Sequence, residues 1–334
     1  IPFFTETFGN SGSSTHSYGW AAQGAVDQAR EALAQVIGAS AEEIIFTSGA
    51  TESNNLAIKG VAEAYLEKGR HIITMATEHA AVLNPCKYLE SLGWRVTYLP
   101  VDSQGLVSVM AANNEIGVLQ PLEKIGQVCR DRQVLFHTDA AQAVGKVPLN
   151  VDAQNIDLMS ITAHKIYGPK GIGALYVRRR PRVNLAPQFH GGGQERGWRS
   201  GTLCVPLIVG LAEAVTLGVR LQAEDNQRIA ALRDRLWNYL KSENSGLTSM
   251  DIPPSDWQGI STSALRESKR LIYCARFDPK WLCPPVPPVA RQLRSFPMFW
   301  QPLGSRIVSR SPTYALGSDG STLLMILTLR LGCF

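Results

Sequence analysis

The sequence predicts an α/β fold in which a mainly parallel sheet lies between helices. Two observations lead to this prediction. Between residues 21 and 177, short apolar runs typical of buried strands alternate with segments whose apolar residues recur at helical spacing. Polar clusters directly follow several of these runs, as expected where loops gather at the carboxyl ends of parallel strands. With 334 residues, of which 45% are hydrophobic, the chain is long enough for a large domain and a smaller second one.

The elements are predicted in a regular order. A helix over residues 21–38 would end at Gly38, because glycine favours the left-handed conformation that closes helices. The next unit is a strand at 43–47, a turn at 48–53 and a helix at 54–67. Further strands are predicted at 71–75, 95–99, 107–110, 134–137, 157–162 and 173–177, and further helices at about 79–92 and 207–241.

The last quarter of the chain differs in composition from the rest. From residue 251 onward it holds ten Lys or Arg and five Asp or Glu, whereas the first 250 residues hold 23 of each. The net charge of +5 therefore belongs to this tail. The proline-rich run Pro284–Pro288 excludes a helix or a central strand there. Binding of nucleic acid through the tail is a hypothesis that rests on its charge alone.

The sequence does not favour a metalloprotein, a disulfide-stabilised protein or a membrane protein. The six cysteines occur singly, without the paired spacing of a zinc site or the density of a disulfide framework. No uninterrupted apolar run reaches the roughly 18 residues of a membrane helix, and no secretion leader is recognised. A cytoplasmic protein with reduced thiols and no bound metal is therefore expected.

Polar clusters that follow five of the predicted strands are the candidate functional residues. Each alone is more often a helix cap or a structural hydrogen-bonding group, but five in succession favour a ligand site. The first cluster lies between a strand and a helix, where backbone N–H groups are suited to hold a phosphate. The clusters are Ser48–Ser53, Glu78–His79, Asn113–Glu115, His137–Gln142 and Thr162–Lys165.

Lys165 indicates the class of ligand. It follows the apolar run 158–161, and at a partly buried strand end the charged form of a lysine is disfavoured, which is the condition for a Schiff-base lysine. A pyridoxal phosphate site also needs an aspartate for the pyridine nitrogen, a ring stacked on the cofactor and a helix N-terminus for the phosphate. Asp139, His79 and the turn at 48–51 are suited to supply these three parts.

Six motifs, in this order, resemble those of the pyridoxal-phosphate-dependent cysteine desulfurases, within the class V aminotransferases. The resemblance extends over roughly residues 9 to 215. It implies the pyridoxal-phosphate fold type I, similar to aspartate aminotransferase, with a smaller C-terminal domain. The motifs are FTSGATESNN at 46–55, TEHAAV at 77–82, NNEIG at 113–117, HTDAAQ at 137–142, TAHKIYGPKG at 162–171, and HGGGQER at 190–196 followed by RSGT at 199–202.

The resemblance implies a role for each matching residue around the cofactor ring. Lys165 would carry pyridoxal 5'-phosphate as a Schiff base, and His79 would stack on the ring and take part in proton transfer. Asp139 would pair with the pyridine nitrogen. Gln142 would hydrogen-bond the ring hydroxyl, and Asn114 would contact substrate and cofactor.

The resemblance also implies a phosphate subsite and a set of partners. The phosphate ligands would be Ala50, Thr51, Thr162 and His164, joined by Thr202 from the other subunit of a homodimer. The implied activity converts L-cysteine to L-alanine and passes sulfur, as an enzyme persulfide, to an acceptor scaffold protein. This sulfur would feed iron–sulfur cluster assembly and tRNA thiolation, with no membrane and no direct nucleic-acid contact expected.

The sequence departs from the family pattern in three places. The family's first strand and the turn after it are absent, and residues 102–106 join directly to Ser108 where the family carries a helix and the start of a strand. An internal deletion near residue 107 is therefore inferred.

After Thr202 the sequence contains neither the Ser-Gly-Ser-Ala-Cys loop that carries the persulfide cysteine nor the Arg-Phe-Gly-x-Gly-Arg-Phe segment that binds the substrate carboxylate. Cys204 lies in a different motif.

The two missing motifs recur in an alternative reading frame. With permitted codons read from the third base, residues 281–289 give Ala-Val-Ser-Ser-Gly-Ser-Ala-Cys, and residues 314–321 give Arg-Phe-Gly-Phe-Gly-Arg-Phe. The hypothesis is that the chain after about residue 245–270 is an out-of-frame translation of a desulfurase C-terminus.

The sequence thus predicts two domains, a cofactor-binding domain over residues 1–218 and the remnant of a small domain over 219–334. Cofactor binding without sulfide release is the expected behaviour of this chain. Two alternatives stay open, namely another class V enzyme, such as a selenocysteine lyase or a small-amino-acid transaminase, and a catalytically dead remnant.

Overall fold

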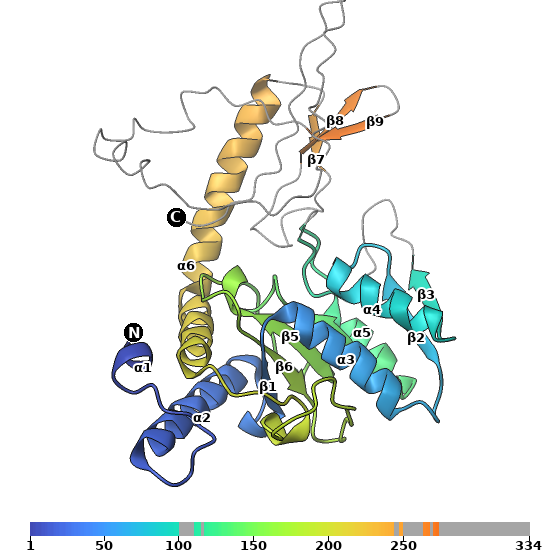
Figure 1. Ribbon diagram of the computed structural model, residues 1–334. Helices are drawn as coiled ribbons and strands as arrows, with labels where there is room; N and C mark the ends of the chain where they lie inside the picture. Colours follow the sequence, from blue (N-terminus) through green and yellow to red (C-terminus); the bar gives the residue numbers. More distant parts are fainter. Residues whose placement is uncertain (100–109, 115–116, 244–246, 250–262, 268–269, 274–334) are drawn as a thin grey trace, which may run out of the picture. The chain divides into compact units, whose positions relative to one another are not determined.

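The computed structural model describes residues 1–99, 110–114, 117–243, 247–249, 263–267 and 270–273 (Figure 1). Those up to residue 243 form one compact unit, while β8 (Ser263–Glu267) and β9 (Arg270–Tyr273) form an antiparallel pair in a second unit. The short strand β7 (Leu247–Ser249) is assigned to the same sheet as that pair. The inferred deletion near residue 107 and both out-of-frame motifs lie outside the described residues.

The larger unit alternates helices with strands, as the sequence predicted, but the sequence did not indicate the helices at 2–5 and 122–131. Its helices are α1 (Pro2–Thr5), α2 (Ser17–Ile37), α3 (Ala50–Ala64), α4 (Ala80–Ser91), α5 (Leu122–Asp131) and α6 (Val205–Glu243). Its strands are β1 (Ile44–Thr47), β2 (His71–Met75), β3 (Arg95–Leu99), β4 (His137–Asp139), β5 (Leu158–Thr162) and β6 (Gly173–Val177). Gly38, with φ of 71°, caps α2 where the sequence placed the end of that helix. The predicted domain boundary after residue 218 lies inside α6, and those domain limits stay a prediction.

The sheet of the larger unit is mixed, where the sequence predicted a mainly parallel one. Its strand order is β1-β6-β5-β4; β4 and β5 are parallel, whereas β6 is antiparallel to both of its neighbours. Strands β2 and β3 form a separate parallel pair. The reversal of β6 has a simple cause, because residues 163–172 between β5 and β6 are too few for the helical crossover that a parallel connection needs.

Several predicted boundaries are wrong: helix α2 begins at Ser17 rather than at 21, and two other shifts have a clear physical cause. Helix α3 begins at Ala50 rather than at 54, because the carboxylate of Glu52 accepts a hydrogen bond from the Ser48 N–H at 2.7 Å and closes the turn within two residues. Strand β4 begins at His137 rather than at 134, because the Val134 N–H bonds to the Cys129 carbonyl at the end of α5. The strand predicted at 107–110 lies outside the described residues except for Met110, which belongs to no strand.

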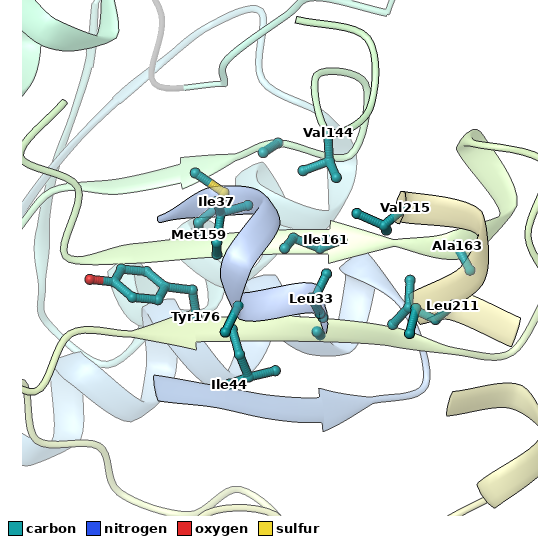
Figure 2. Close-up of a cluster of buried hydrophobic side chains, with 14 of the residues drawn as sticks. Leu33, Ile37, Ile44, Val144, Met159, Ile161, Ala163, Tyr176, Leu211 and Val215 are labelled. Carbon is teal, nitrogen blue, oxygen red and sulfur yellow. The ribbon is translucent and has the colours of Figure 1, made fainter. Parts of the chain in front are cut away.

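One face of the sheet packs against α2 and α6. Met159 of β5 and Tyr176 of β6 lie in a fully buried cluster with Leu33 of α2 and Leu211 of α6 (Figure 2). The apolar positions of the helices face the sheet at the spacing that predicted them. This cluster is the main hydrophobic core, and it supports the strands from which the candidate site extends.

The opposite face is covered by α3. Leu158 of β5 and Leu175 of β6 pack there with Leu56 of α3 in a second buried cluster. Leu158 and its neighbour Met159 belong to different clusters because successive side chains of a strand point to opposite faces. The predicted arrangement of a sheet covered by helices on both faces is confirmed.

Helix α6 contains a stretch, Val205–Tyr239, that is long and apolar enough to cross a membrane by length and composition alone. Packing explains this apolarity in its first half, where Val205, Ile208, Leu211 and Val215 are buried in the main core. A core helix passes the same test of composition as a membrane span, and the absence of a membrane segment stays a prediction.

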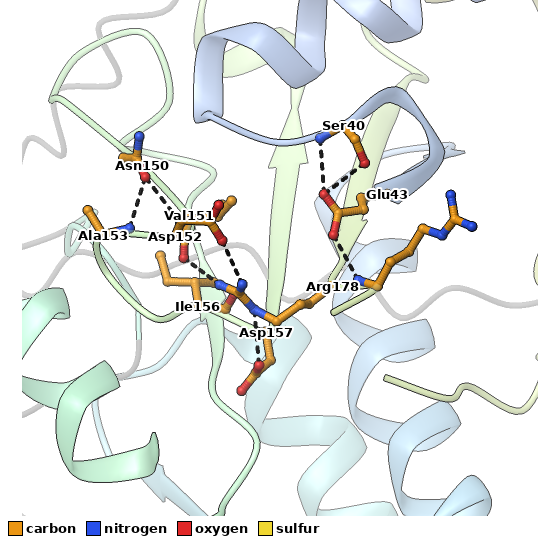
Figure 3. A network of polar contacts seen from close by, with 10 residues as sticks. Ser40, Glu43, Asn150, Val151, Asp152, Ala153, Ile156, Asp157 and Arg178 are labelled. Carbon is orange, nitrogen blue, oxygen red and sulfur yellow. Dashed lines mark hydrogen bonds and ion pairs between the residues drawn. The ribbon is translucent and has the colours of Figure 1, made fainter. Parts of the chain in front are cut away.

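Arg178 directly follows β6. It binds the segment 151–157, which leads into β5, through hydrogen bonds and ion pairs (Figure 3). Its guanidinium, 4% exposed, donates to the Asp152 carboxylate at 2.6 Å and to the carbonyls of Val151 and Ile156, and it lies 3.3 Å from Asp157. A buried guanidinium needs this many acceptors to offset its desolvation. The network therefore fixes the entry of β5, at whose other end the candidate site lies.

Candidate cofactor site

Asp139, the last residue of β4, lies at the carboxyl end of the parallel pair and is 4% exposed. Its Oδ2 atom accepts a hydrogen bond from Asn54 Nδ2 of α3 at 2.7 Å, and its Oδ1 atom accepts one from the Ala141 N–H at 2.9 Å. Burial raises the pKa of this carboxyl, and those two hydrogen bonds and the charges of His79 and Lys165 oppose the rise. Asp139 is therefore a buried, oriented acid within electrostatic range of both predicted catalytic side chains.

The turn between β1 and α3 gathers the residues predicted to hold a phosphate. Gly49 has φ of 150° and precedes α3, whose first N–H groups, at Ala50 and Thr51, have no acceptor within the helix. A Cβ atom at Gly49 would lie 3.7 Å from Thr162 Oγ1, so the end of β5 lies beside this turn. Thr162 Oγ1 is in turn 2.9 Å from His164 Nδ1. Four of the predicted phosphate ligands thus meet at a helix N-terminus, which favours anions.

Gly173, the first residue of β6, allows this close approach. A Cβ atom there would lie 2.6 Å from the Cα of Gly49, closer than real side chains come. The turn therefore rests directly on the strand because Gly173 has no side chain. The sequence placed Gly173 in a glycine-rich connection without indicating this contact.

Lys165 lies in the turn η2 (Ala163–Lys165), directly after β5, and its side chain is exposed. The prediction of a partly buried Lys165 is therefore wrong, because β5 already ends at Thr162 and the lysine lies three residues beyond the buried strand. The environment predicted for it is found at Lys146, which the sequence did not indicate. Burial, and then the charge of Lys165, lowers the pKa of Lys146 to about 8.

Gln142 and Lys146 lie in the segment that follows Asp139. Lys146 Nζ donates a hydrogen bond to Gln142 Oε1 at 3.1 Å, and Gln142 is half-buried. The charge of Lys165 acts on Lys146, so these side chains belong to the same end of the sheet as Asp139.

Two histidines near the site differ in their surroundings. His79 is exposed at the start of α4, where its Nδ1 atom accepts from the Ala81 N–H at 3.0 Å and so fixes the ring as a helix cap. His137 has its Nε2 atom 3.0 Å from Ser160 Oγ, and burial lowers its pKa to about 4. His137 is therefore neutral at physiological pH and structural, while His79, like His164, is exposed and available to a ligand.

The segment before Asn114 is held against the site by the acid that precedes His79. Glu78 is buried, and its Oε1 atom accepts from the Met110 N–H at 2.7 Å. The Ala111 N–H donates to the Asp139 carbonyl at 3.0 Å, so this segment runs beside β4. Asn114 itself is half-buried, and its predicted contact with substrate and cofactor stays a prediction.

The loop at 190–202 is fixed to α2 and to the first turn of α3 by two ion pairs. Glu195, buried at 6% exposure, binds the guanidinium of Arg30 through both carboxylate oxygens at 2.6 and 2.7 Å. Arg199 donates to Glu52 in the first turn of α3 at 2.7 Å. Thr202 follows on the surface, and its predicted role towards a partner subunit stays a prediction. Both ion pairs were missed from the sequence, although Glu195 lies inside a quoted motif.

The similarity of this chain to known proteins agrees with this geometry. A family model described as aminotransferase class-V matches residues 1–256, well over half of the chain. The chain belongs to the class-V aminotransferases. Members of this family, including its cysteine desulfurases, depend on pyridoxal phosphate.

Among curated class-V aminotransferases, the chain is 54% identical over 261 residues to cysteine desulfurase IscS of Rickettsia prowazekii (strain Madrid E), which covers 73% of this chain. This chain therefore spans less than two thirds, namely 64%, of the length of that relative. Two solved structures are also similar. A NifS-like protein has a TM-score of 0.75 and 39% identity, covering 79% of this chain and 76% of its own. A structure titled SspA in complex with cysteine has a TM-score of 0.62 and 47% identity, covering 64% and 66%.

The residues present in this class-V aminotransferase fit the family's cofactor. The buried carboxylate of Asp139 suits the protonated nitrogen of a pyridine ring, and the N-terminus of α3 with Thr162 and His164 suits a phosphate. Asn54 Oδ1 is a buried oxygen without a hydrogen-bond partner in the described part of the chain, so this amide has capacity left for a ligand.

Proposed function

We propose that the larger unit binds pyridoxal 5'-phosphate through Lys165 and belongs to a cysteine desulfurase that acts on L-cysteine. The observation that carries the proposal is Asp139, a buried carboxylate within electrostatic range of Lys165 and beside a helix N-terminus suited to phosphate. The similarity to cysteine desulfurases, and to a protein whose structure contains cysteine, supports the choice of substrate.

The cofactor, when bound, supplies an electron sink for the charge that develops at the Cα atom of the amino acid. Asp139 keeps a proton on the ring nitrogen and so maintains that capacity. Lys165 would provide the amine that holds the cofactor. His79, fixed as the cap of α4, is placed to move a proton. Ala50, Thr51, Thr162 and His164 orient the phosphate end.

The complete reaction converts L-cysteine to L-alanine and needs an enzyme thiolate that receives the sulfur as a persulfide. We propose a sulfur-acceptor scaffold protein and a second copy of the chain as partners, with Thr202 reaching the phosphate of the other copy, and a cytoplasmic location. The sequence contains no Ser-Gly-Ser-Ala-Cys loop. The expected activity of this chain therefore stops before sulfur transfer.

We expect the cofactor-loaded full chain to exchange the Cα hydrogen of L-cysteine with solvent deuterium while releasing no sulfide above background. Binding and proton removal need Lys165, Asp139 and His79, whereas sulfide release needs the missing cysteine loop. Proton NMR of L-cysteine in D2O measures the first, and a colorimetric sulfide assay measures the second. Replacing His79 with alanine should slow the exchange by about 10²–10⁴-fold, the usual contribution of a general acid or base.

Four outcomes would oppose this proposal. Robust sulfide release would show that another thiol, such as the exposed Cys204, replaces the missing loop. Exchange with L-alanine or another small amino acid but not with L-cysteine would favour a different class V enzyme, and selenide release from selenocysteine would favour a lyase. The absence of any exchange despite bound cofactor would favour a catalytically dead remnant.

We also propose that the coding sequence shifts frame upstream of residue 281. The expected result of sequencing the coding DNA is an open third-base frame from residue 281 through residue 321 that encodes both missing motifs. Stop codons in that frame, or codons that do not give the Ser-Gly-Ser-Ala-Cys motif, would refute the proposal. Restoring the frame in an expression vector should then restore sulfide release.

A further inference from the structure

Lys146 lies in the segment 141–147 between β4 and the loop before β5, and this segment is held from two sides. The backbone carbonyl of Lys146 accepts a hydrogen bond from Asn226 Nδ2 of α6 at 2.9 Å. Its neighbour Gly145 has φ of 75°, and a Cβ atom there would lie 3.4 Å from Ile166 just after η2. The backbone that carries Lys146 is therefore fixed to the core helix and to the turn that carries Lys165.

The hydrogen bond from Lys146 decides how the Gln142 amide is oriented. An ammonium group has three donors and no acceptor, so only the oxygen of an amide can face it. Lys146 Nζ lies 3.1 Å from Gln142 Oε1. The Nε2 donors of Gln142 are then the groups left for a ligand, and such donors bind an acceptor oxygen rather than a hydroxyl proton.

The positive charges near the Gln142 amide favour a negatively charged ligand oxygen, as its N–H donors do. Burial, and then the charge of Lys165, lowers the pKa of Lys146 to about 8. Below that pH Lys146 keeps its proton and its role as donor, and above it the ammonium loses a proton and the amide is free to rotate. A cation and an amide donor together stabilise a negative charge on an oxygen bound beside Gln142.

We propose that Lys146 is a positioning residue that holds Gln142 as a donor to the ring oxygen of the cofactor, so that the site binds this oxygen as a phenolate. The inference rests on the proposed function, because it takes pyridoxal phosphate as the ligand. Loss of Lys146 would let the amide turn its oxygen towards the ligand and would remove a nearby positive charge. Both changes would raise the pH at which the bound cofactor loses its proton.

A pH titration of the visible absorbance of the cofactor-loaded full chain tests this proposal. In Lys146→Met the midpoint should rise by about one pH unit, equivalent to tenfold in proton affinity. In Lys146→Arg it should stay within about 0.3 unit of the unsubstituted chain, because a guanidinium also only donates. An unchanged midpoint in Lys146→Met, or an equal rise in Lys146→Arg, would overturn the proposal. Far-UV circular dichroism of both variants confirms that they fold.

A second measurement does not need the cofactor and so separates this proposal from the proposed function. Urea unfolding of the cofactor-free chain with Lys146→Met, Gln142→Leu and the double variant forms a double-mutant cycle. Non-additive changes are expected, because the two side chains share a hydrogen bond. Additive changes would overturn the positioning role whether or not the chain binds the cofactor. If the stability changes are non-additive but the unsubstituted chain shows no visible absorbance band after loading with the cofactor, only the proposed function is refuted.

Discussion

Replacing Glu195 with alanine is expected to lower the free energy of unfolding by about 3–5 kcal/mol, the usual effect of removing one partner of a buried ion pair. The carboxylate is held by both nitrogens of Arg30, and its Oε2 atom also accepts from the Phe46 N–H of β1 at 2.7 Å. The substitution leaves a buried guanidinium and a strand N–H without this acceptor. Urea unfolding followed by circular dichroism measures the change.

A matched pair of controls distinguishes the ion pair from a general effect of substitution. Glu42→Ala removes an exposed acid that lies 3.7 Å from Arg179 and should leave the urea midpoint almost unchanged, because an exposed ion pair contributes little. The double variant Arg30→Met with Glu195→Gln removes the unpaired charge and should recover part of the loss. A loss below about 1 kcal/mol in Glu195→Ala would contradict the structural role given to this pair.

The same ion pair has a consequence for the candidate site. Glu195 belongs to the loop at 190–202, which continues through Arg199, paired with Glu52 in the first turn of α3, to Thr202. Loosening this loop should therefore weaken cofactor binding in addition to lowering stability, because the first turn of α3 is the proposed phosphate subsite. The dissociation constant of the cofactor, measured by absorbance titration, is expected to rise in Glu195→Ala.

The order of the elements could be predicted from the sequence because apolar spacing distinguishes helices from strands locally. Gly38 closed α2 as predicted, and the strands at 71–75 and 95–99 were confirmed residue by residue. The direction of β6 could not be predicted in this way. It depends on how few residues separate β5 from β6, which the predicted pattern of alternation did not take into account.

Some features of the candidate site could be expected from the sequence, and others could not. Ala50, Thr51, Thr162 and His164 follow strands or open a helix, but their grouping into one phosphate subsite was implied by the family resemblance and not by apolar spacing. The exposure of Lys165 could not be predicted, because the burial of its side chain depends on where β5 ends and not on the apolar run before it. Asn54, which binds Asp139, comes from an element 85 residues away, and no local pattern reports such a contact.

Replacing Lys165 with alanine is expected to abolish covalent retention of the cofactor, because Lys165 is the amine that follows β5 within electrostatic range of Asp139. The matched control is Lys170→Ala, which removes another exposed lysine from the same connection between β5 and β6. The control should keep the visible absorbance band of the unsubstituted chain, and Lys165→Ala should lose it.

The most direct test of the account is the location of the cofactor after reduction. The full chain is loaded with pyridoxal phosphate, treated with borohydride and digested, and its peptides are examined by mass spectrometry. The account predicts one reduced cofactor on the peptide that contains Lys165, and none in Lys165→Ala. Label on Lys146, whose pKa is lowered to about 8, would contradict it, as would an unlabelled chain or label that persists in Lys165→Ala.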